Sequence, residues 1–168
     1  KYFVAGRSSF FFFFVRHVHA VDGVSLSLRR SEVIALVGES GCGKSTLGLL
    51  LMGLEDPSEG TVKFEDRDIT HLNDGQRKDL RRKIQMVFQD PYESLNPTQT
   101  IGDIINEPLL VHGIGALQQE RDERVKKAME DSGLKPAEVY LSRYPHELSG
   151  GQRQRVVIAA ALVLEPEI

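Results

Sequence analysis

A glycine-rich segment with a lysine near its end could hold phosphate groups. Residues 38–46 read Gly-Glu-Ser-Gly-Cys-Gly-Lys-Ser-Thr, which matches the pattern G-x-x-x-x-G-K-[ST] in full. A nucleoside triphosphate carries a row of negative oxygens, and consecutive backbone N–H groups at a helix N-terminus can bind them. The segment therefore predicts a nucleotide-binding loop, here named the phosphate loop, made of Gly38, Ser40, Gly41, Cys42, Gly43, Lys44, Ser45 and Thr46.

The residue types in the phosphate loop predict separate roles. Glycines let the backbone turn and approach the phosphates, where a side chain would block the approach. We expect Lys44 to reach the β- and γ-phosphates, the Ser45 hydroxyl to coordinate Mg²⁺, and Thr46 to add a phosphate contact. Kinases, GTPases, helicases and transporters all use such a loop, so it predicts nucleotide binding without selecting among these classes.

A second segment could also bind an anion. Residues 148–152 read Leu-Ser-Gly-Gly-Gln and precede an apolar, helix-like run at 156–164. Ser149 can cap that helix while the N–H groups of Gly150 and Gly151 stay open to a phosphate. An ordinary helix cap followed by two glycines explains the segment when it is taken alone, whereas the phosphate loop upstream favours phosphate binding.

The pattern of apolar residues predicts an α/β fold around the phosphate loop. Residues 18–20 and 24–28 alternate as strands do, and we expect them to pair antiparallel. Residues 33–37 are continuously apolar and end at the loop, which is typical of a central parallel strand. Residues 47–54 then predict the helix that the loop opens.

Helical patterns dominate the second half of the chain. A strand at 61–64 and a polar helix at 74–83 lead to an apolar strand at 84–88. After a loop-like stretch that contains prolines, helical patterns appear at 101–111 and 117–132. We therefore expect a helical insert after the α/β part.

Composition narrows the class of protein. The net charge of -3 and the pI near 6.0 give no global basic field that would favour nucleic acid. The single cysteine, Cys42, cannot form an internal disulfide, which fits a reducing cytosol, and we expect it only to fit the tight loop. No apolar stretch approaches the roughly 20 residues that span a bilayer. The five phenylalanines at 10–14 fit either a strand buried on both faces or an aggregation-prone edge.

Together the two glycine-containing segments resemble the ABC ATPase family, in which Leu-Ser-Gly-Gly-Gln is the signature motif. The resemblance implies ATP and Mg²⁺ as cofactors and a dimer in which each subunit completes the other's site. Ser149, Gly150, Gly151 and Gln152 would then act in trans, on the nucleotide held by the phosphate loop of the partner.

The resemblance also assigns further site residues. Gln89, which ends the apolar strand before the helical insert, matches the family's Q-loop and would contact Mg²⁺ together with Ser45. Lys44 and Gln89 are thereby the catalytic residues that this chain supplies. Phe14 is a candidate for stacking on adenine, with His17 and His19 as competitors and a core phenylalanine as the alternative.

Three further sequence segments indicate a subgroup of this family. Residues 37–44, 88–97 and 144–147 resemble the ATPases of dipeptide, oligopeptide and nickel importers. Ser31 stands where that family usually has glycine, and we expect it to be tolerated in a turn.

The family pattern continues past residue 168 with an apolar strand that ends in the Walker B aspartate and the catalytic glutamate. The resemblance thus implies one incomplete ABC ATPase domain over residues 1–168, with little or no ATPase activity because the catalytic glutamate is absent. Its parts would be a nucleotide-binding core at 1–89, a helical subdomain at 90–149, and a signature helix at 150–168 that returns towards the core.

The expected function is ATP binding and hydrolysis that energises import of peptides or a related small solute. The resemblance implies two transmembrane permease subunits, a second ATPase subunit and, indirectly, an extracytoplasmic solute-binding protein as partners. It places the protein peripherally at the cytoplasmic face of the membrane, without nucleic acid. Two alternatives are a soluble ABC-type ATPase in DNA repair or translation and a non-catalytic nucleotide-binding module. Either homodimer or heterodimer fits, and the solute is chosen by other subunits.

Overall fold

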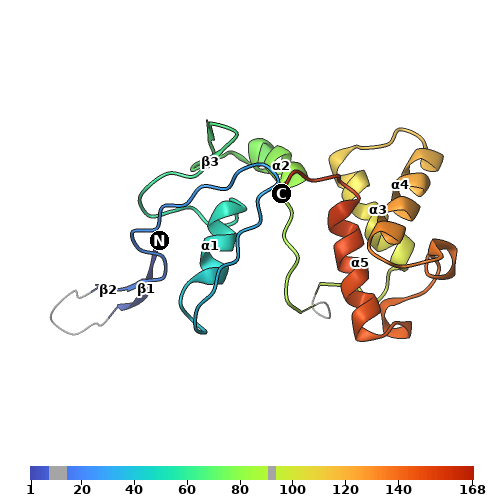
Figure 1. Ribbon diagram of the computed structural model, residues 1–168, viewed down its shortest axis with the longest axis horizontal. Helices are drawn as coiled ribbons and strands as arrows, with labels where there is room; N and C mark the ends of the chain where they lie inside the picture. Colours follow the sequence, from blue (N-terminus) through green and yellow to red (C-terminus); the bar gives the residue numbers. More distant parts are fainter. Residues whose placement is uncertain (8–14, 91–93) are drawn as a thin grey trace. The chain divides into compact units, whose positions relative to one another are not determined.

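A computed structural model describes residues 1–7, 15–90 and 94–168 of the chain (Figure 1). The chain divides into two compact units, Lys1–Arg77 and Lys78–Ile168. No helix in the described residues is both long and apolar enough to cross a bilayer.

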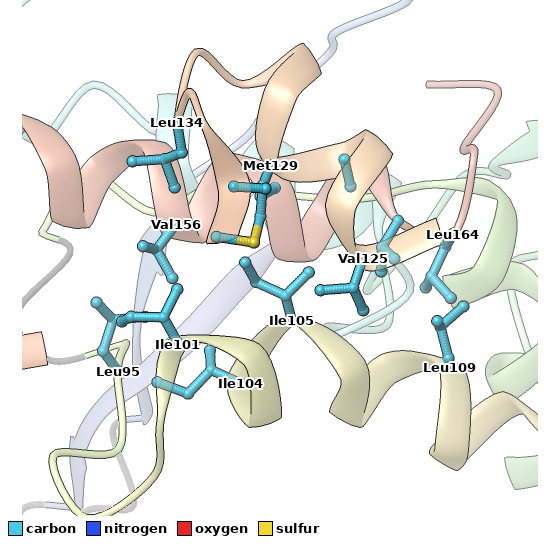
Figure 2. Packing of buried hydrophobic residues seen from close by; sticks show 14 of the residues in the cluster. Leu95, Ile101, Ile104, Ile105, Leu109, Val125, Met129, Leu134, Val156 and Leu164 are labelled. Atoms are coloured by element: carbon cyan, nitrogen blue, oxygen red, sulfur yellow. The ribbon is translucent and has the colours of Figure 1, made fainter. Parts of the chain in front are cut away.

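The buried faces of three helices form the core of the second unit (Figures 1 and 2). They are α3 (Ile101–His112), α4 (Gln118–Asp131) and α5 (Gly150–Leu162). Two short 3-10 helices, η1 (Ala137–Val139) and η2 (Pro145–Glu147), connect α4 to α5. The largest fully buried side chains in this core are Ile101, Ile105, Leu109, Met129, Leu134 and Val156.

Local sequence explains where α3 begins and ends. Thr100 accepts a hydrogen bond from the Asp103 N–H while the Asp103 carboxylate accepts from the Thr100 N–H, which is a capping box. Gly113 ends the helix in the left-handed region, with φ 65°. The helices that the sequence predicts at 101–111 and 117–132 are confirmed within about one residue at each end.

The first unit contains a strand pair at its N-terminal end. Strands β1 (Tyr2–Arg7) and β2 (Val15–His19) pair antiparallel with Tyr2 opposite His19. The N–H groups of Ala20 and Val21 both donate to the Lys1 carbonyl, at 3.0 and 3.1 Å. The predicted pairing of residues 18–20 with 24–28 is therefore wrong, since β2 pairs with β1 and residues 24–28 form no strand.

Helix α1 (Lys44–Leu51) follows the phosphate loop, and a small hairpin of β3 (Lys63–Phe64) and β4 (Arg67–Asp68) lies further along the first unit. Helix α2 (Asp74–Lys83) has the predicted bounds. Helix α1 begins three residues earlier than the predicted 47–54, because it starts inside the loop itself.

The apolar segment at 33–37, predicted as a central parallel strand, is not a strand in the described structure. Val33 and Val37 are 94% and 92% exposed, and no described residue pairs with 33–37. A parallel strand is buried on both faces and needs a neighbour for its ladder, and this segment has neither. Ser31, just before it, lies in a turn with φ 62°.

Residues 84–88 form no strand, but two backbone hydrogen bonds near Ile84 have the pattern of parallel strand pairing. The Ile168 N–H donates to the Lys83 carbonyl at 3.2 Å, and the Gln85 N–H donates to the Ile168 carbonyl at 2.9 Å. These two bonds on either side of Ile84 have the pattern of parallel pairing between Ile84 and Ile168. The strand predicted at 84–88 is therefore not formed, and this single residue pair is the only trace of strand pairing in that segment of the described structure.

Candidate functional site

The phosphate loop ends in a helix N-terminus that no side chain caps. Gly43 is the N-cap of α1, with φ 94° and no side-chain hydrogen bond. The first N–H groups of a helix have no partner within the helix, and the helix dipole makes this end positive. The first turn of α1 contains no acidic residue that would compete with an anion.

Two glycines of the loop are required by close contacts within the chain. A Cβ on Gly43 would lie 2.0 Å from the carbonyl oxygen of Ala20, and its positive φ also disfavours a side chain. A Cβ on Gly38 would lie 2.6 Å from the Cys42 sulfur. At Gly41 the space is open, but φ is 82°. The loop is thus folded tightly, and its residue Gly43 lies against Ala20, the residue after β2.

The Lys44 ammonium folds back over the loop. Its Nζ donates to the carbonyls of Gly38 and Glu39, at 2.8 and 2.6 Å, and lies 3.5 Å from the Cys42 sulfur. The positive charge therefore lies inside the curve of the loop, where an anion entering it would meet that charge. The Ser45 side chain is exposed on the same turn, and Thr46 is half-buried.

The residues present fit a magnesium ion that is bound together with a nucleotide. Among the described residues there is no group of three or more His, Cys, Asp or Glu side chains that could hold a metal by themselves. Mg²⁺ in nucleotide sites takes most ligands from phosphates and water, with one or two from the protein. The exposed Ser45 hydroxyl suits that role. Gln89 belongs to the second unit, and its pairing with Ser45 stays a prediction.

Gln89 is exposed and lines an open hollow of about 650 Å³. Its neighbours in that hollow include Phe88, Pro108 of α3 and Val157 of α5, so the hollow faces the helical core.

Three rings cluster beside the end of β2. The Tyr2 ring centroid lies 5.1 Å from that of His17 and 5.5 Å from that of His19. The carbonyl of Ala20, which follows His19, contacts Gly43. Phe14, the first candidate for adenine stacking, lies outside the described residues. The sequence did not identify Tyr2 as a neighbour of these histidines, because its position opposite His19 depends on the pairing of β1 with β2.

The Leu-Ser-Gly-Gly-Gln segment forms the start of α5. The Ser149 hydroxyl accepts from the Gln152 N–H at 3.3 Å, and the Gln152 side chain accepts from the Ser149 N–H at 2.9 Å. A Cβ on Gly150 or Gly151 would meet nothing within 4 Å. Since neither glycine is required by crowding within the chain, the open space in front of them suits a group that approaches from outside.

Comparison with known families gives one match for most of the chain. The sequence matches the family described as "ABC transporter" over residues 21–168.

Curated relatives are similar over the same region. The chain is 49% identical to the oligopeptide transport ATP-binding protein AppF of Bacillus subtilis (strain 168), over 100% of this chain and 50% of that protein. It is 50% identical to the dipeptide transport ATP-binding protein DppF of Haemophilus influenzae, over 91% of this chain and 46% of that protein. The chain therefore spans about half the length of the curated relatives it matches.

Solved structures share the backbone. The dimeric post-hydrolysis structure of the ATP-binding cassette MJ0796, bound to ADP and Pi, is 32% identical and has a TM-score of 0.84, covering 99% of this chain and 67% of that one. Clostridium perfringens cbiO1, part of the ABC transporter complex cbiONQ, is 31% identical with a TM-score of 0.77, covering 90% and 57%. These similarities confirm the predicted α/β P-loop fold class, even though strand pairing is sparse in the described residues.

Proposed function

This chain belongs to the ABC transporter family, and we propose that it binds ATP through the phosphate loop. The observation that carries the proposal is the position of the Lys44 ammonium, 2.8 Å from the Gly38 carbonyl and at the uncapped start of α1. Phosphate oxygens entering the loop would exchange places with these carbonyls as partners of the ammonium. The N–H groups that follow Gly43 would bind the same phosphates.

The longer protein that this chain matches would hydrolyse ATP. In this proposal Lys44 stabilises charge on the phosphates, Ser45 binds Mg²⁺, and Gln89 contacts the ion. The remaining catalytic groups would come from the part of the relatives' length that this chain does not span.

A partner subunit would complete each nucleotide site. The start of α5 supports this arrangement, because Ser149 and Gln152 satisfy each other while Gly150 and Gly151 remain open. These residues would bind the γ-phosphate held by the partner's loop. The dimeric structures of MJ0796 offer a precedent in a similar protein.

The task of the assembled protein would be import of peptides or a related small solute at the cytoplasmic face of a membrane. The names of the relatives favour this role over DNA repair or translation, since these relatives are peptide-transport ATP-binding proteins. Two permease subunits and a solute-binding protein would be the partners. The residues after Gln89, about 90–111, would dock on the permease.

Isothermal titration of the 168-residue chain with Mg-ATP tests the nucleotide-binding step. Lys44→Ala should weaken binding by about 100-fold, as expected for loss of a charge-assisted contact in a phosphate site. Lys63→Ala removes the same charge from an exposed position in β3 and should leave the affinity unchanged. Equal affinities for the wild-type chain and Lys44→Ala would contradict the proposal.

A further inference from the structure

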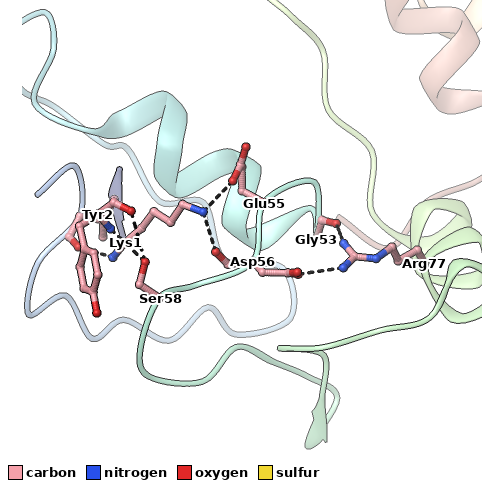
Figure 3. Close-up of polar contacts among 8 residues, drawn as sticks. Lys1, Tyr2, Gly53, Glu55, Asp56, Ser58 and Arg77 are labelled. Atoms are coloured by element: carbon pink, nitrogen blue, oxygen red, sulfur yellow. Dashed lines mark hydrogen bonds and ion pairs between the residues drawn. The ribbon is translucent and has the colours of Figure 1, made fainter. Parts of the chain in front are cut away.

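A cluster of polar contacts lies at the end of α1 opposite the phosphate loop (Figure 3). Arg77, in the first turn of α2, donates from Nη1 to the Gly53 carbonyl and from Nη2 to Asp56 Oδ1 at 2.8 Å. Its Nε donates to the Leu72 carbonyl at 3.0 Å. One guanidinium thus joins the turn after α1 to the segment before α2.

The Gly53 carbonyl belongs to the structure that ends α1. The Gly53 N–H donates to the Leu50 carbonyl at 3.1 Å and the Leu54 N–H to the Leu49 carbonyl at 2.9 Å, with Gly53 at φ 60°. This pattern is a Schellman motif. Arg77 therefore binds the residue that follows the C-cap, Met52, of the helix whose first residue is Lys44.

Packing holds α1 only weakly. The helix has eight residues, of which Leu50 alone is buried, and its last turn contains no basic residue. A helix this short is marginal by itself. The guanidinium of Arg77 supplies the positive charge that the C-terminal end of the helix dipole favours. Lys1 adds a second cation, since its Nζ lies 2.8 Å from Glu55 Oε2 and donates to the Asp56 carbonyl at 3.0 Å.

The contacts of Arg77 need a planar side chain with several donors. Its side chain is 22% exposed, so the three bonds are partly shielded from water. Lysine carries the same charge on a single nitrogen and cannot reproduce the fork that reaches Gly53, Asp56 and Leu72 together.

We propose that Arg77 is a positioning residue for the phosphate loop. By fixing the C-terminal end of α1, it keeps Lys44 and the first-turn N–H groups in the arrangement that binds the β-phosphate. This role rests on the proposed function, and Arg77 itself does not contact the nucleotide. Without the guanidinium, α1 frays from its C-terminal end. Nucleotide binding must then order the helix, and this entropic cost reduces the free energy gained from the phosphates.

Calorimetric titration of the 168-residue chain with ADP and with AMP tests this role. AMP lacks the β-phosphate, so the ratio of the two affinities isolates what the phosphate loop contributes. Arg77→Gln should lower the ADP-to-AMP ratio about tenfold, which corresponds to about 1.4 kcal/mol. Arg77→Lys should give an intermediate ratio. Lys78→Gln, which removes an exposed charge from the next position of α2, should leave the ratio unchanged.

A loss of folded protein would weaken both nucleotides alike and would not move the ratio. Asp56→Asn keeps Arg77 and removes only the charge it pairs with; it should lower the ratio by about threefold. Wild-type ratios in Arg77→Gln and Asp56→Asn would overturn the role of Arg77 while leaving nucleotide binding intact. A wild-type chain that binds neither nucleotide would overturn the proposed function and the role of Arg77 with it.

Discussion

Ala20 and Gly43 are in direct backbone contact, because the Ala20 carbonyl oxygen lies 2.0 Å from the point where a Cβ on Gly43 would stand. The contact joins the end of β2 to the residue that caps α1. Gly43 is therefore required both for its left-handed backbone and for the space its missing side chain leaves.

Gly43→Ala should abolish nucleotide binding in the 168-residue chain. The added methyl group must displace the Ala20 carbonyl and also occupy a left-handed conformation that costs about 1–2 kcal/mol. Gly60→Ala is the matched control, since Gly60 has φ 84° and open space around it. This variant therefore has the backbone strain of a left-handed alanine but no steric clash. Titration with Mg-ATP should show no binding for the first variant and near wild-type affinity for the second. Binding by Gly43→Ala at wild-type strength would contradict the steric requirement.

Gly150→Ala should leave the chain as stable as the wild type, because the new methyl group meets nothing within 4 Å. Ser149→Ala should instead cost about 1 kcal/mol through loss of the helix cap. Thermal unfolding measured by circular dichroism distinguishes the two.

The proposed role in trans adds a second expectation for Gly150→Ala. In a full-length ATPase dimer the same substitution should lower ATP turnover strongly, since the methyl group would occupy the space offered to the partner's nucleotide. Full turnover in that dimer would show that the open space has no such use.

The side chain of Asp56 should titrate below its ordinary pKa of 3.8, because the hydrogen bond from Arg77 favours the ionised carboxylate. A depressed pKa in the folded state means that this pair stabilises the fold above the ordinary pKa and that the stabilisation is lost as the pH falls through the lowered value. In Arg77→Gln the pKa of Asp56 should rise towards its ordinary range. Carbon-detected NMR titration of the carboxyl group measures both values, and identical pKa values in the two proteins would exclude the pairing.

Ile105→Ala should destabilise the second unit by about 3 kcal/mol, because the side chain is fully buried between the helices of its core (Figure 2). Leu117→Ala provides the comparison, since Leu117 is 71% exposed and its removal should change the free energy of unfolding by less than about 0.5 kcal/mol. Urea denaturation followed by helix content gives both numbers. Similar midpoints for the two variants would mean that this core does not stabilise the helices.

The helices could be predicted from the sequence because their signals are local. In α2 the polar run and its bounds at 74–83 agree with the structure, and in α3 the residues that mark its ends, Thr100 and Gly113, directly flank the helix. Helix hydrogen bonds join residues four positions apart, so where a helix forms depends little on distant parts of the chain.

The strands could not be predicted as well, because each needs a partner that local sequence does not identify. Residues 24–28 alternate correctly, yet β2 pairs with β1. Residues 33–37 have the composition of a central strand but no described neighbour, so their valines are exposed.

The motif of the phosphate loop could be identified from the sequence, whereas the contacts that hold the loop and α1 in place could not. G-x-x-x-x-G-K-[ST] identifies Lys44, but nothing local shows that Ala20 touches Gly43 or that Arg77 holds the far end of α1. Those contacts join residues more than twenty positions apart and appear only once the chain is folded.

The most direct test of nucleotide binding at the phosphate loop is a ¹⁵N–¹H correlation spectrum of the labelled chain, recorded with and without Mg-ATP. The account predicts that the largest amide shifts fall at residues 38–46, with those of Gly43 and Lys44 among them, and that Lys44→Ala removes them. Shifts that are absent, or that concentrate outside this loop, would contradict it.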